Sequence, residues 1–577
     1  MKLRILIIAT LILSLPCFFS SCDTGTSVDN SSISTDSSII AAGEASFRKN
    51  CSGCHNFRQD GIGPQLSGIT TEISVDWIHG FISDSKKMIE SGDERAVQMF
   101  NKYKKAVMPS FATLKDDEVN AIIAFLHTHK YSGQQGAKGK GGELSNPIPD
   151  TIALSNLVVN LEPVTQIPPS SDSAKMPLTR ITKLTFQPNT GNLFINDLRG
   201  KLYKLQQNKP IVYMDMAKLK PKFFHESGLA TGFGSFAFHP EFSKNGILYT
   251  THAEAPGSGR ADFGFPDSIE VSLQWVLTEW KTENPNASTF SGKSRELFRV
   301  NMVSDVHGVQ EITFNPLSKP GDEDYGMLYI GVGDGGVVGE GYPFLTHSTE
   351  QIWGTILRID PMARNSANGQ YGIPKNNPFA QSQHTKILRE IYAYGFRNPH
   401  RITWTNSGDM LACNIGQGNI ESVNLVMPGH DYGWPIREGT FLSSDVNENL
   451  GKVYPLPAND SPYKITYPVA QYDHDEGLAI SGGFEYRGKD IPELKGKYLF
   501  GDIAKGRLFY INIADIKQGG QAPIREWKIM LNGNFRTLKE ICGSDRVDLH
   551  FGSDSRGELY ILTKTDGKVH KLVSAAM

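Results

Sequence analysis

Two short runs of residues decide the fold of most of this chain: Ile312-Thr313-Phe314-Asn315-Pro316 and, shortly after it, Met327-Leu328-Tyr329-Ile330-Gly331. Each run has an apolar and aromatic centre and ends at a small residue or a turn former, which is typical of a short β-strand. Related runs lie at 184–188, 192–196, 236–240, 246–250, 497–501 and 558–562. A strand pair that recurs about every 50–80 residues indicates a blade repeat.

The length of the repeating region sets the expected number of blades. From about residue 150 onward the sequence predicts no long amphipathic helix, and turn formers are frequent, with 57 Gly and 31 Pro in the chain. Residues 151–577 would accommodate six blades with long loops, so we predict an all-β, six-bladed β-propeller. An array of β-sandwiches is the alternative that the pattern leaves open.

The composition is that of an ordinary folded protein. Hydrophobic residues make up 39% and charged residues 21% of the 577 residues, which excludes a disordered chain and a polytopic membrane protein. The formal net charge of -3 leaves no global basic field that would hold nucleic acid. Six cysteines are too few for a disulfide scaffold of this size.

The first 22 residues are predicted to be an export signal. Lys2 and Arg4 precede an apolar run over 5–15, which is shorter than a membrane span of about 20 residues. The stretch Phe19-Ser20-Ser21-Cys22 resembles the lipobox of bacterial lipoproteins, so Cys22 is the predicted lipidation site, with plain secretion as the alternative. Lipid chains would hold the protein at the cell envelope, facing the periplasm or the cell surface.

The motif Cys51-Ser52-Gly53-Cys54-His55 is the CxxCH signature of c-type haem attachment. The thiols of Cys51 and Cys54 would add to the haem vinyl groups, and His55 would become an axial ligand of the iron. A turn at Gly61-Ile62-Gly63-Pro64 follows, and a carbonyl there could accept a hydrogen bond from the other His55 nitrogen.

The sixth iron ligand is predicted to be Met108, because a loop methionine before a proline has little packing reason to be there. Met88 and Met99 lie in amphipathic, helix-like sequence and are predicted to be core residues. His79, His127 and His129 are predicted to be surface histidines.

Helix-like stretches flank the haem motif. Gly43, Phe47 and Cys51 share one helical face, and a second amphipathic stretch covers 115–129. With the CxxCH motif and the methionine loop, residues 41–131 resemble an all-α class I cytochrome c domain. The resemblance implies that Gly43 and Phe47 pack on the face formed by 122–125.

The chain is therefore predicted to be a multidomain protein. Residues 23–40 are rich in Ser, Thr and Asp and are expected to be a flexible tether, and the Gly-, Lys- and Gln-rich stretch 132–150 is expected to be a linker. The predicted order is a signal peptide (1–22), the tether (23–40), the cytochrome c domain (41–131), the linker (132–150) and the propeller (151–577).

Two motifs in the propeller region resemble binding sites, one for a dinucleotide and one for a metal, but lack the context that such sites need. Gly331-Val332-Gly333-Asp334-Gly335-Gly336 satisfies GxGxxG, but no helical pattern follows it, so we interpret it as a glycine-rich blade loop. Asp473-His474-Asp475-Glu476 lacks a metal-ligand spacing and is interpreted as a solvated loop. Cys413 and Cys542 are interpreted as buried small residues, with a disulfide between them as the alternative.

Several segments, taken in order, carry a family resemblance. They are 236–240, His307 ahead of 312–316, Gly395-Phe396-Arg397-Asn398-Pro399, 414–417, Asp431-Tyr432-Gly433-Trp434-Pro435 and 482–488. Together they resemble the glucose/sorbosone dehydrogenase family, which contains soluble pyrroloquinoline quinone (PQQ) sugar dehydrogenases and non-enzymatic hedgehog-interacting-protein-like propellers.

The resemblance implies a role for each matching residue. His307 would be the general base that takes a proton from the sugar hydroxyl while hydride goes to the quinone. Arg397 and Asn398 would contact PQQ, with Arg397 stabilising negative charge that develops on the quinone. The carbonyls of Gly416 and Gln417 would bind Ca²⁺. Looser matches are Arg487, Lys505 and Arg507 for the PQQ carboxylates, and Glu421 and Tyr432 for a second Ca²⁺.

The sequence also departs from the family's enzymes. The segment 228–232 lacks their substrate-binding Gln, Val306 replaces the acidic residue before the base, and 416–417 resembles the non-enzymatic branch. These departures make glucose an uncertain substrate, and they keep open that His307 is a loop histidine without chemistry.

Three functions follow from these patterns. The first is a membrane-anchored quinohaemoprotein that oxidises a sugar, alcohol or aldehyde with PQQ and Ca²⁺ and passes electrons through haem c to an external cytochrome, quinone-linked or copper protein. The second is a non-catalytic carbohydrate- or protein-binding propeller with an electron-transfer haem. The third, a cytochrome-propeller reductase of the denitrification type, is disfavoured, since 15 His include no set arranged for a second metal centre.

Overall fold

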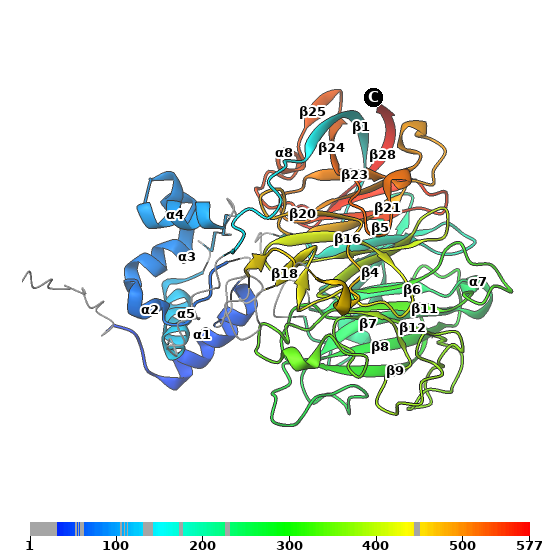
Figure 1. The fold of residues 1–577 in the computed structure, drawn as a ribbon, viewed down its shortest axis with the longest axis horizontal. Helices are drawn as coiled ribbons and strands as arrows, with labels where there is room; N and C mark the ends of the chain where they lie inside the picture. Colours follow the sequence, from blue (N-terminus) through cyan, green and yellow to red (C-terminus); the bar gives the residue numbers. More distant parts are fainter. Residues whose placement is uncertain are drawn as a thin grey trace, which may run out of the picture.

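The computed structural model consists of a small helical domain beside a large β-domain (Figure 1). The structure describes residues 32–51, 55, 57, 63–103, 107–108, 110–111, 114–130, 142–171, 177–225, 231–443, 451–457 and 459–577. The predicted export signal and Cys22 therefore lie outside the described residues. In the described part of the chain, no helix is both long enough and apolar enough to cross a membrane.

The helical domain is built around two crossing helices. Gly43 lies at the crossing, because a Cβ there would collide with the backbone carbonyl of Ala121. Phe47 packs against Phe125 with 5.4 Å between ring centroids, as the resemblance to a class I cytochrome c domain implies. The helices are α1 (Ser37–Asn50), α2 (Ile69–Glu72), α3 (Val75–Glu90), α4 (Glu94–Lys102) and α5 (Asp116–Thr128).

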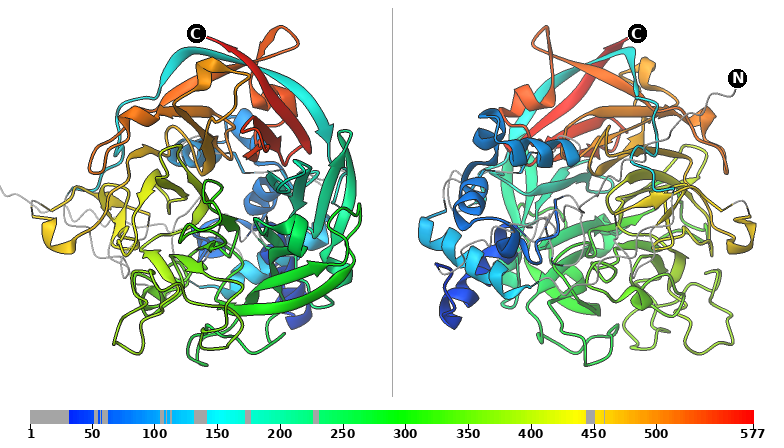
Figure 2. Two further views of the ribbon diagram at one scale, coloured as in Figure 1. Left: turned by 90° about the vertical axis from the view of Figure 1, so that its right-hand side faces the viewer. Right: turned by 60° about the vertical axis from the view of Figure 1, so that its left-hand side comes forward.

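The β-domain contains six units of four strands that follow one another around a ring (Figure 2, left). Each blade runs from an inner to an outer strand through antiparallel pairs. Blade 1 has β2 (Ile181–Phe186), β3 (Leu193–Asp197), β4 (Lys201–Gln206) and β5 (Lys209–Asp215); blade 2 has β6 (Phe233–Phe238), β7 (Ile247–Glu254), β8 (Leu273–Thr282) and β9 (Gly292–Met302); blade 3 has β10 (Glu311–Phe314), β11 (Leu328–Val332), β12 (Thr355–Ile359) and β13 (Ile391–Tyr394).

The second half of the ring continues the pattern with insertions. Blade 4 has β14 (Pro399–Trp404), β15 (Met410–Asn414), β16 (Ile420–Val426) and β20 (Ala470–Asp473); blade 5 has β21 (Ile480–Glu485), β22 (Lys497–Asp502), β23 (Leu508–Asn512) and β24 (Arg525–Leu531); blade 6 has β26 (Leu549–Ser553), β27 (Leu559–Thr563), β28 (Lys568–Ala576) and β1 (Ala153–Gln166). The small strands are β17 (Arg437–Glu438), β18 (Phe441–Ser443), β19 (Val453–Tyr454) and β25 (Asn534–Arg536), and the short helices are α6 (Met216–Leu219), α7 (Phe242–Asn245) and α8 (Leu538–Cys542).

The ring closes by joining the two ends of the β-domain. Strand β1, which follows the linker, pairs antiparallel with the C-terminal strand β28, with Val158 opposite Ala576 and Gln166 opposite Lys568. The same strand also pairs in parallel with β24 of blade 5. The prediction of an all-β, six-bladed propeller is confirmed, and the longest α-helix after residue 150 in the described part has 5 residues.

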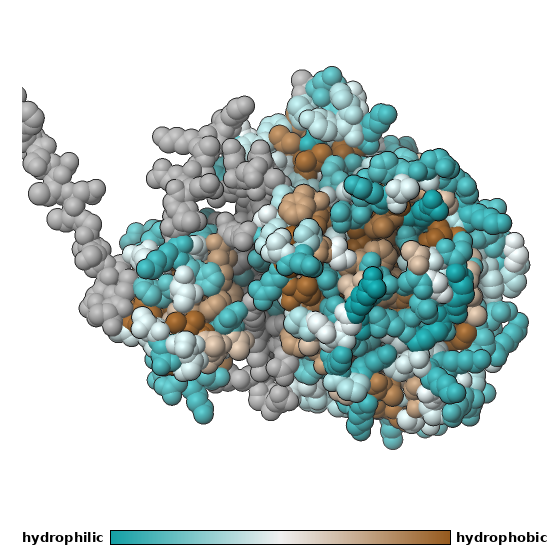
Figure 3. All heavy atoms as spheres, turned by 90° about the horizontal axis from the view of Figure 1, so that it is seen from below, coloured by the Kyte–Doolittle hydropathy of each residue, from teal (hydrophilic) through white to brown (hydrophobic). Residues whose placement is uncertain are grey.

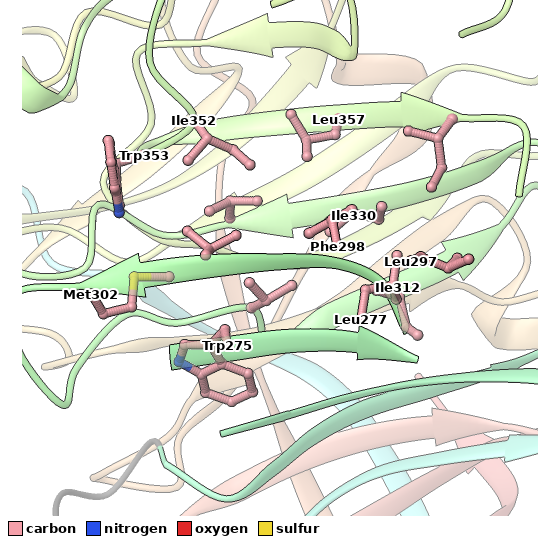
Figure 4. Packing of buried hydrophobic residues seen from close by; sticks show 14 of the residues in the cluster. Trp275, Leu277, Leu297, Phe298, Met302, Ile312, Ile330, Ile352, Trp353 and Leu357 are labelled. Atoms are coloured by element: carbon pink, nitrogen blue, oxygen red, sulfur yellow. The ribbon is translucent and has the colours of Figure 1, made fainter. Parts of the chain in front are cut away.

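The blades are held together by hydrophobic packing between neighbouring sheets. Figure 4 shows the cluster that fills the space between blades 2 and 3, where Trp275, Met302 and Trp353 lie near the ends of their strands and aliphatic residues fill the middle. Burying such side chains stabilises a fold by about 1.5–3 kcal/mol each. This packing fixes the loops at the strand ends, where the candidate site lies.

The helical domain lies at one end of the ring axis, because its helices are seen behind the ring in the axial view (Figure 2, left). An ion pair joins the two domains, with 3.0 Å between Lys86 Nζ of α3 and Asp545 Oδ2. Asp545 precedes the inner strand of blade 6, so the helical domain faces the end of the ring where the inner strands begin. Seen from below, the surface of the molecule is mostly hydrophilic, with hydrophobic groups interspersed (Figure 3).

Candidate functional site

The candidate site lies where the inner strands of blades 3 and 4 begin. His307 precedes β10, and Arg397 immediately precedes β14. The loop after β11 lies between them, and Asp334 of this loop donates its backbone N–H to the Arg397 carbonyl at 2.7 Å. The ring topology thus brings together residues that are far apart in the sequence.

His307 and Asp334 form a buried dyad. The Nδ1 atom of His307 lies 2.8 Å from Asp334 Oδ1 and, against a carboxylate, is the donor. Trp434 Nε1 donates to the second oxygen, Asp334 Oδ2, at 2.9 Å. The Nε2 atom of His307 is therefore left as the basic nitrogen, which is the arrangement that a general base requires.

The electrostatics of the dyad keep the imidazole neutral. Burial lowers the pKa of His307, the charge of Arg397 lowers it further, and Asp334 acts in the opposite direction. Burial acts to raise the pKa of Asp334, but the interactions with His307, the charge of Arg397 and the N–H of Gly336 together outweigh it, so that pKa is lowered. At neutral pH the pair is accordingly a neutral imidazole beside a carboxylate.

The backbone around His307 is constrained by close packing. His307 has a φ of 50°, in the left-handed region that non-glycine residues seldom adopt. A Cβ on Gly333 would collide with the His307 carbonyl, so only glycine fits on the facing strand end. Backbone strain of this kind clusters at functional sites.

Arg397 is buried against the loop that follows β15. Its Nε donates to the Gln417 side-chain oxygen at 2.8 Å, and its Nη1 donates to the Gly416 carbonyl. Burial lowers the pKa of Arg397, opposed by Asp334 and two glutamates. The Asn414 side chain accepts the backbone N–H groups of Arg397 and Asn398, at 3.1 and 2.9 Å, and so fixes the turn.

The oxygens around the 416–417 loop are already engaged. Glu438 Oε1 accepts four backbone N–H groups, from residues 417–420, at 2.8–3.0 Å. Glu421 accepts from Gly416 N, His474 Nε2 and Ile480 N. A Ca²⁺ ion takes 6–8 oxygen ligands, whereas here the Gly416 carbonyl faces a guanidinium. In this arrangement the oxygen set at Gly416 and Gln417 does not fit Ca²⁺.

The predicted second Ca²⁺ pair is likewise engaged elsewhere. The Tyr432 hydroxyl donates to the Leu425 carbonyl at 2.7 Å and accepts from Met427 N at 2.8 Å. Its ring stacks on Phe396. Burial raises the pKa of Glu421, whose oxygens bind the groups described above. The hydrogen bonds of Tyr432 thus lie within blade 4, and those of Glu421 extend to the first residue of blade 5.

Three basic residues were looser matches to the family's PQQ-binding cations. The structure brings two of them to the end of the propeller where His307 and Arg397 lie. Lys505 lies in the turn between β22 and β23 and donates to the carbonyls of His474 and Asp475, at 3.3 and 2.9 Å. Arg507 follows it and pairs with Glu476 and Glu526. Arg487 lies elsewhere, because its guanidinium binds the carbonyls of Trp404 and Thr405 where the inner strand of blade 4 ends.

The haem residues of the helical domain fit the cofactor. The His55 Nδ1 lies 2.9 Å from the Pro64 carbonyl, so the turn after the CxxCH motif orients the ring and leaves Nε2 for iron. Gly63 cradles the ring, since a Cβ there would lie 2.9 Å from His55 Nε2. Met108 is half-buried, and its carbonyl accepts from Ser85 Oγ at 2.8 Å. Cys51 caps the end of α1, and Cys54 lies outside the described residues.

Other histidines and cysteines have structural contacts. His129 stacks on Phe57, His127 binds Thr70 and His79 faces Asp116. Cys413 and Cys542 are buried, separate thiols, so the disulfide alternative is wrong.

One interpretation of the loop 473–476 needs correction. Asp473, His474 and Glu476 are buried, not solvated. His474 Nε2 pairs with Glu421 at 3.0 Å, and Asp473 accepts the Ile148 N–H at 3.1 Å. Within the described residues no group of three or more acidic, His or Cys side chains could hold a metal.

Comparison with known proteins identifies the family to which each domain is similar. The family model described as glucose/sorbosone dehydrogenase matches residues 178–570, and a cytochrome c model matches residues 40–130. The chain belongs to the glucose/sorbosone dehydrogenase family. Its helical domain is a cytochrome c domain, with haem and electron transfer as its supported role.

The relatives include both branches of the family. HIPL1 protein of Arabidopsis thaliana is 27% identical over 58% of this chain and 52% of its own length. Quinoprotein glucose dehydrogenase B of Acinetobacter calcoaceticus is 23% identical over 61% of this chain and 76% of its own. A crystal structure of glucose dehydrogenase matches with 20% identity, a TM-score of 0.49 and coverage of 70% and 98%. The chain spans about half the length of the plant relatives it matches.

Proposed function

We propose that this protein is a membrane-anchored quinohaemoprotein dehydrogenase that oxidises a sugar, alcohol or aldehyde. The observation that carries the proposal is the buried dyad, with 2.8 Å between His307 Nδ1 and Asp334 Oδ1, at the end of the propeller that faces a cytochrome c domain. A propeller that only bound another protein would have no evident use for a haem domain at that end.

The proposed chemistry assigns one step to each member of the site. The free Nε2 of His307 takes the proton from the substrate hydroxyl, and Asp334 stabilises the resulting imidazolium. Trp434 holds Asp334 in place through its N–H. PQQ, when bound, supplies the quinone that accepts the hydride. The guanidinium of Arg397 would then stabilise the negative charge that develops on the quinone.

PQQ carries carboxylates, so its site needs cationic side chains. Such side chains are present at the end of the propeller where His307 lies. Arg397, Arg180 and Lys505 come from blades 4, 1 and 5 at this end of the ring. Burial lowers the pKa of Arg180 to about 10. Burial also lowers the pKa of Lys505. These cations, of which Arg397 is buried and the other two are partly buried, fit an anionic quinone. Arg180 enters the proposed set although the sequence did not point to it.

The haem would carry the electrons away one at a time. His55 and Met108 would ligate the iron, with Cys51 and Cys54 holding the haem covalently, and the final acceptor would be an external redox protein. The predicted lipid on Cys22 would anchor the protein at the cell envelope, facing the periplasm or the cell surface. Both the anchor and this location are part of the proposal.

A non-catalytic, ligand-binding propeller is the second candidate function. The observation that favours it is the engagement of Arg397 with Gly416 and Gln417, which satisfies the guanidinium without any cofactor. In that case the haem would serve an outside partner. The similarity to HIPL1 protein is consistent with this candidate.

The deciding experiment follows haem reduction by absorbance. The haem-loaded protein without its lipid anchor is incubated with PQQ, with and without Ca²⁺, and a panel of aldoses and alcohols is added. We expect haem reduction that requires PQQ and is lost in His307→Asn. No reduction by any substrate, together with no calorimetric binding of PQQ, would favour the binding propeller.

The chain offers a matched control for His307. His347 also has a left-handed backbone, with a φ of 53°, and also pairs with an aspartate. It does so through Nε2, which lies 2.9 Å from Asp431 Oδ2, so its basic nitrogen is Nδ1 and not the Nε2 that His307 presents. His347→Asn is therefore expected to keep substrate-dependent haem reduction.

A further inference from the structure

Two histidines face each other inside the propeller, below the candidate site. His400 is the second residue of β14 and His550 is the second residue of β26, and both strands are innermost in their blades. Their ring centroids are 5.6 Å apart, although blade 5 separates their blades in the sequence of the ring. The two rings therefore meet at the central axis.

Both rings are buried and lack partners. His400 is 5% exposed and His550 is 1% exposed. Within the described residues, none of their four ring nitrogens has a hydrogen-bond partner. Ser481, the second residue of the inner strand β21 between them, has a buried hydroxyl that is also without a partner there. Each unsatisfied buried polar group costs about 1–3 kcal/mol, so this concentration points to an occupant.

The charge beneath the two rings is positive. Glu311 is shared by two cations: it accepts from Lys183 Nζ at 2.5 Å and from the guanidinium of Arg401. One carboxylate thus faces two buried cations. Arg401 is also one of the charges that act on both histidines.

The charge above the rings is positive too. Lys564, which follows β27, is one of the charges that act on both histidines. Burial lowers its pKa to about 8, opposed by Asp548. Asp548 is itself paired with Arg546, whose Nε donates to Asp548 Oδ1 at 2.8 Å. The other carboxylate acting on Lys564, Asp197, also faces Arg180.

A cation is therefore a poor occupant of this space. Burial lowers the pKa of both histidines well below the ordinary value, and neighbouring cations lower it further. The rings stay neutral, so each carries one N–H group that can donate a hydrogen bond. N–H and O–H donors within a positive field are the chemistry that binds a small anion.

We propose that the central channel holds a small monovalent anion, of the size of chloride, between His400 and His550, with Ser481 and Lys564 as further donors. The anion balances the cations that the channel carboxylates leave uncompensated. This site lies one layer below the dyad and does not depend on whether the propeller oxidises a substrate.

The test is thermal unfolding of the haem-loaded full chain without added PQQ, in sodium chloride or sodium bromide against sodium gluconate at constant ionic strength. Tryptophan fluorescence reports on the propeller, where six of the 7 Trp lie. We expect the halides to raise the midpoint saturably, by about 2 °C, as a ligand of the native state does. Gluconate is too large to enter a closed channel.

A pair of variants locates the effect. His550→Gln is expected to abolish the difference between chloride and gluconate. His570→Gln is the matched control, because His570 is equally buried in blade 6 and has an unpartnered Nδ1, but lies on the third strand, away from the axis. This control is expected to keep the halide effect.

Crystals grown in sodium bromide give a test that needs no variant. We expect an anomalous bromine peak between the rings of His400 and His550. A midpoint that does not distinguish halide from gluconate, a halide effect retained in His550→Gln, or a channel that holds only water would overturn the proposal. Stabilisation by zinc in place of halide would overturn it as well.

Discussion

The cytochrome c domain and the propeller each fix one histidine in the same way, and the difference between the two lies in the partner. His55 is held through Nδ1 by the Pro64 carbonyl at 2.9 Å, and His307 is held through Nδ1 by the Asp334 carboxylate at 2.8 Å. Both arrangements present Nε2. A neutral carbonyl orients a ligand for a metal, whereas a carboxylate also stabilises the imidazolium that forms when a base takes a proton.

The largest expected effect comes from removing the base itself. His307→Asn takes away the free Nε2, so substrate-dependent haem reduction is expected to fall about 1000-fold, within the range for general bases. The absorbance spectrum of the haem is expected to stay unchanged, since His55 is in the other domain. A variant with normal turnover would remove the functional contrast between the two histidines.

The next largest effect comes from giving His307 an uncharged partner, like that of His55. Asp334→Asn is expected to lower turnover about 100-fold, because the imidazolium loses its counter-charge. Asp334 raises the pKa of His307, so its loss shifts the acidic limb of the pH–rate profile to lower pH. Arg397 lowers the same pKa, so Arg397→Gln is expected to shift the limb to higher pH. Equal shifts in one direction would contradict the assignment.

The corresponding change in the cytochrome c domain acts on stability. Gly63→Ala puts a methyl group against the His55 ring, at 2.9 Å from Nε2. Overpacking of this kind costs about 2 kcal/mol, a factor of about 30 in the folding equilibrium. Denaturant titration followed by haem absorbance measures it, and tryptophan fluorescence of the propeller is expected to be unaffected. An unchanged haem transition would show that the ring moves without cost.

A smaller effect is expected from the group that orients Asp334. Trp434→Phe keeps the aromatic packing and removes the N–H bonded to Asp334 Oδ2 at 2.9 Å. We expect about 10-fold slower turnover, from the loss of one hydrogen bond to a buried carboxylate. Trp280→Phe is the control, because Trp280 is also buried but donates to Thr250 in blade 2.

The smallest effect is expected at the contact between the domains. Lys86 and Asp545 are both more than half exposed, and exposed ion pairs contribute little. Lys86→Glu is expected to slow haem reduction less than about two-fold, and only at low salt, where screening is weak. The double variant Lys86→Glu with Asp545→Lys restores the pair and is expected to recover the rate.

Local sequence patterns predicted the fold well. The strand pairs around 312–331 predicted blades, because they show which residues must be buried. The packing of Gly43 and Phe47 on α5 was implied by the resemblance to a class I cytochrome c domain. The Pro64 carbonyl was within reach of a pattern argument, since it lies a few residues after His55.

The site was harder to predict because its parts come from different blades. Asp334 stood in a glycine-rich loop that we interpreted only as a turn, and nothing nearby in the sequence pairs it with His307. An acidic residue directly after a buried strand end was the available signal. Arg487 matched a family position, yet its guanidinium binds the far end of blade 4, a placement that depends on the register between blades.

The closing strand of the ring has a consequence for biosynthesis. Strand β1 is made soon after the cytochrome c domain, but its antiparallel partner β28 begins only at Lys568. More than 400 residues must be synthesised before the two can meet. The haem domain can therefore mature while the propeller is still an open chain, and the ring closes only when β28 has been made and pairs with β1.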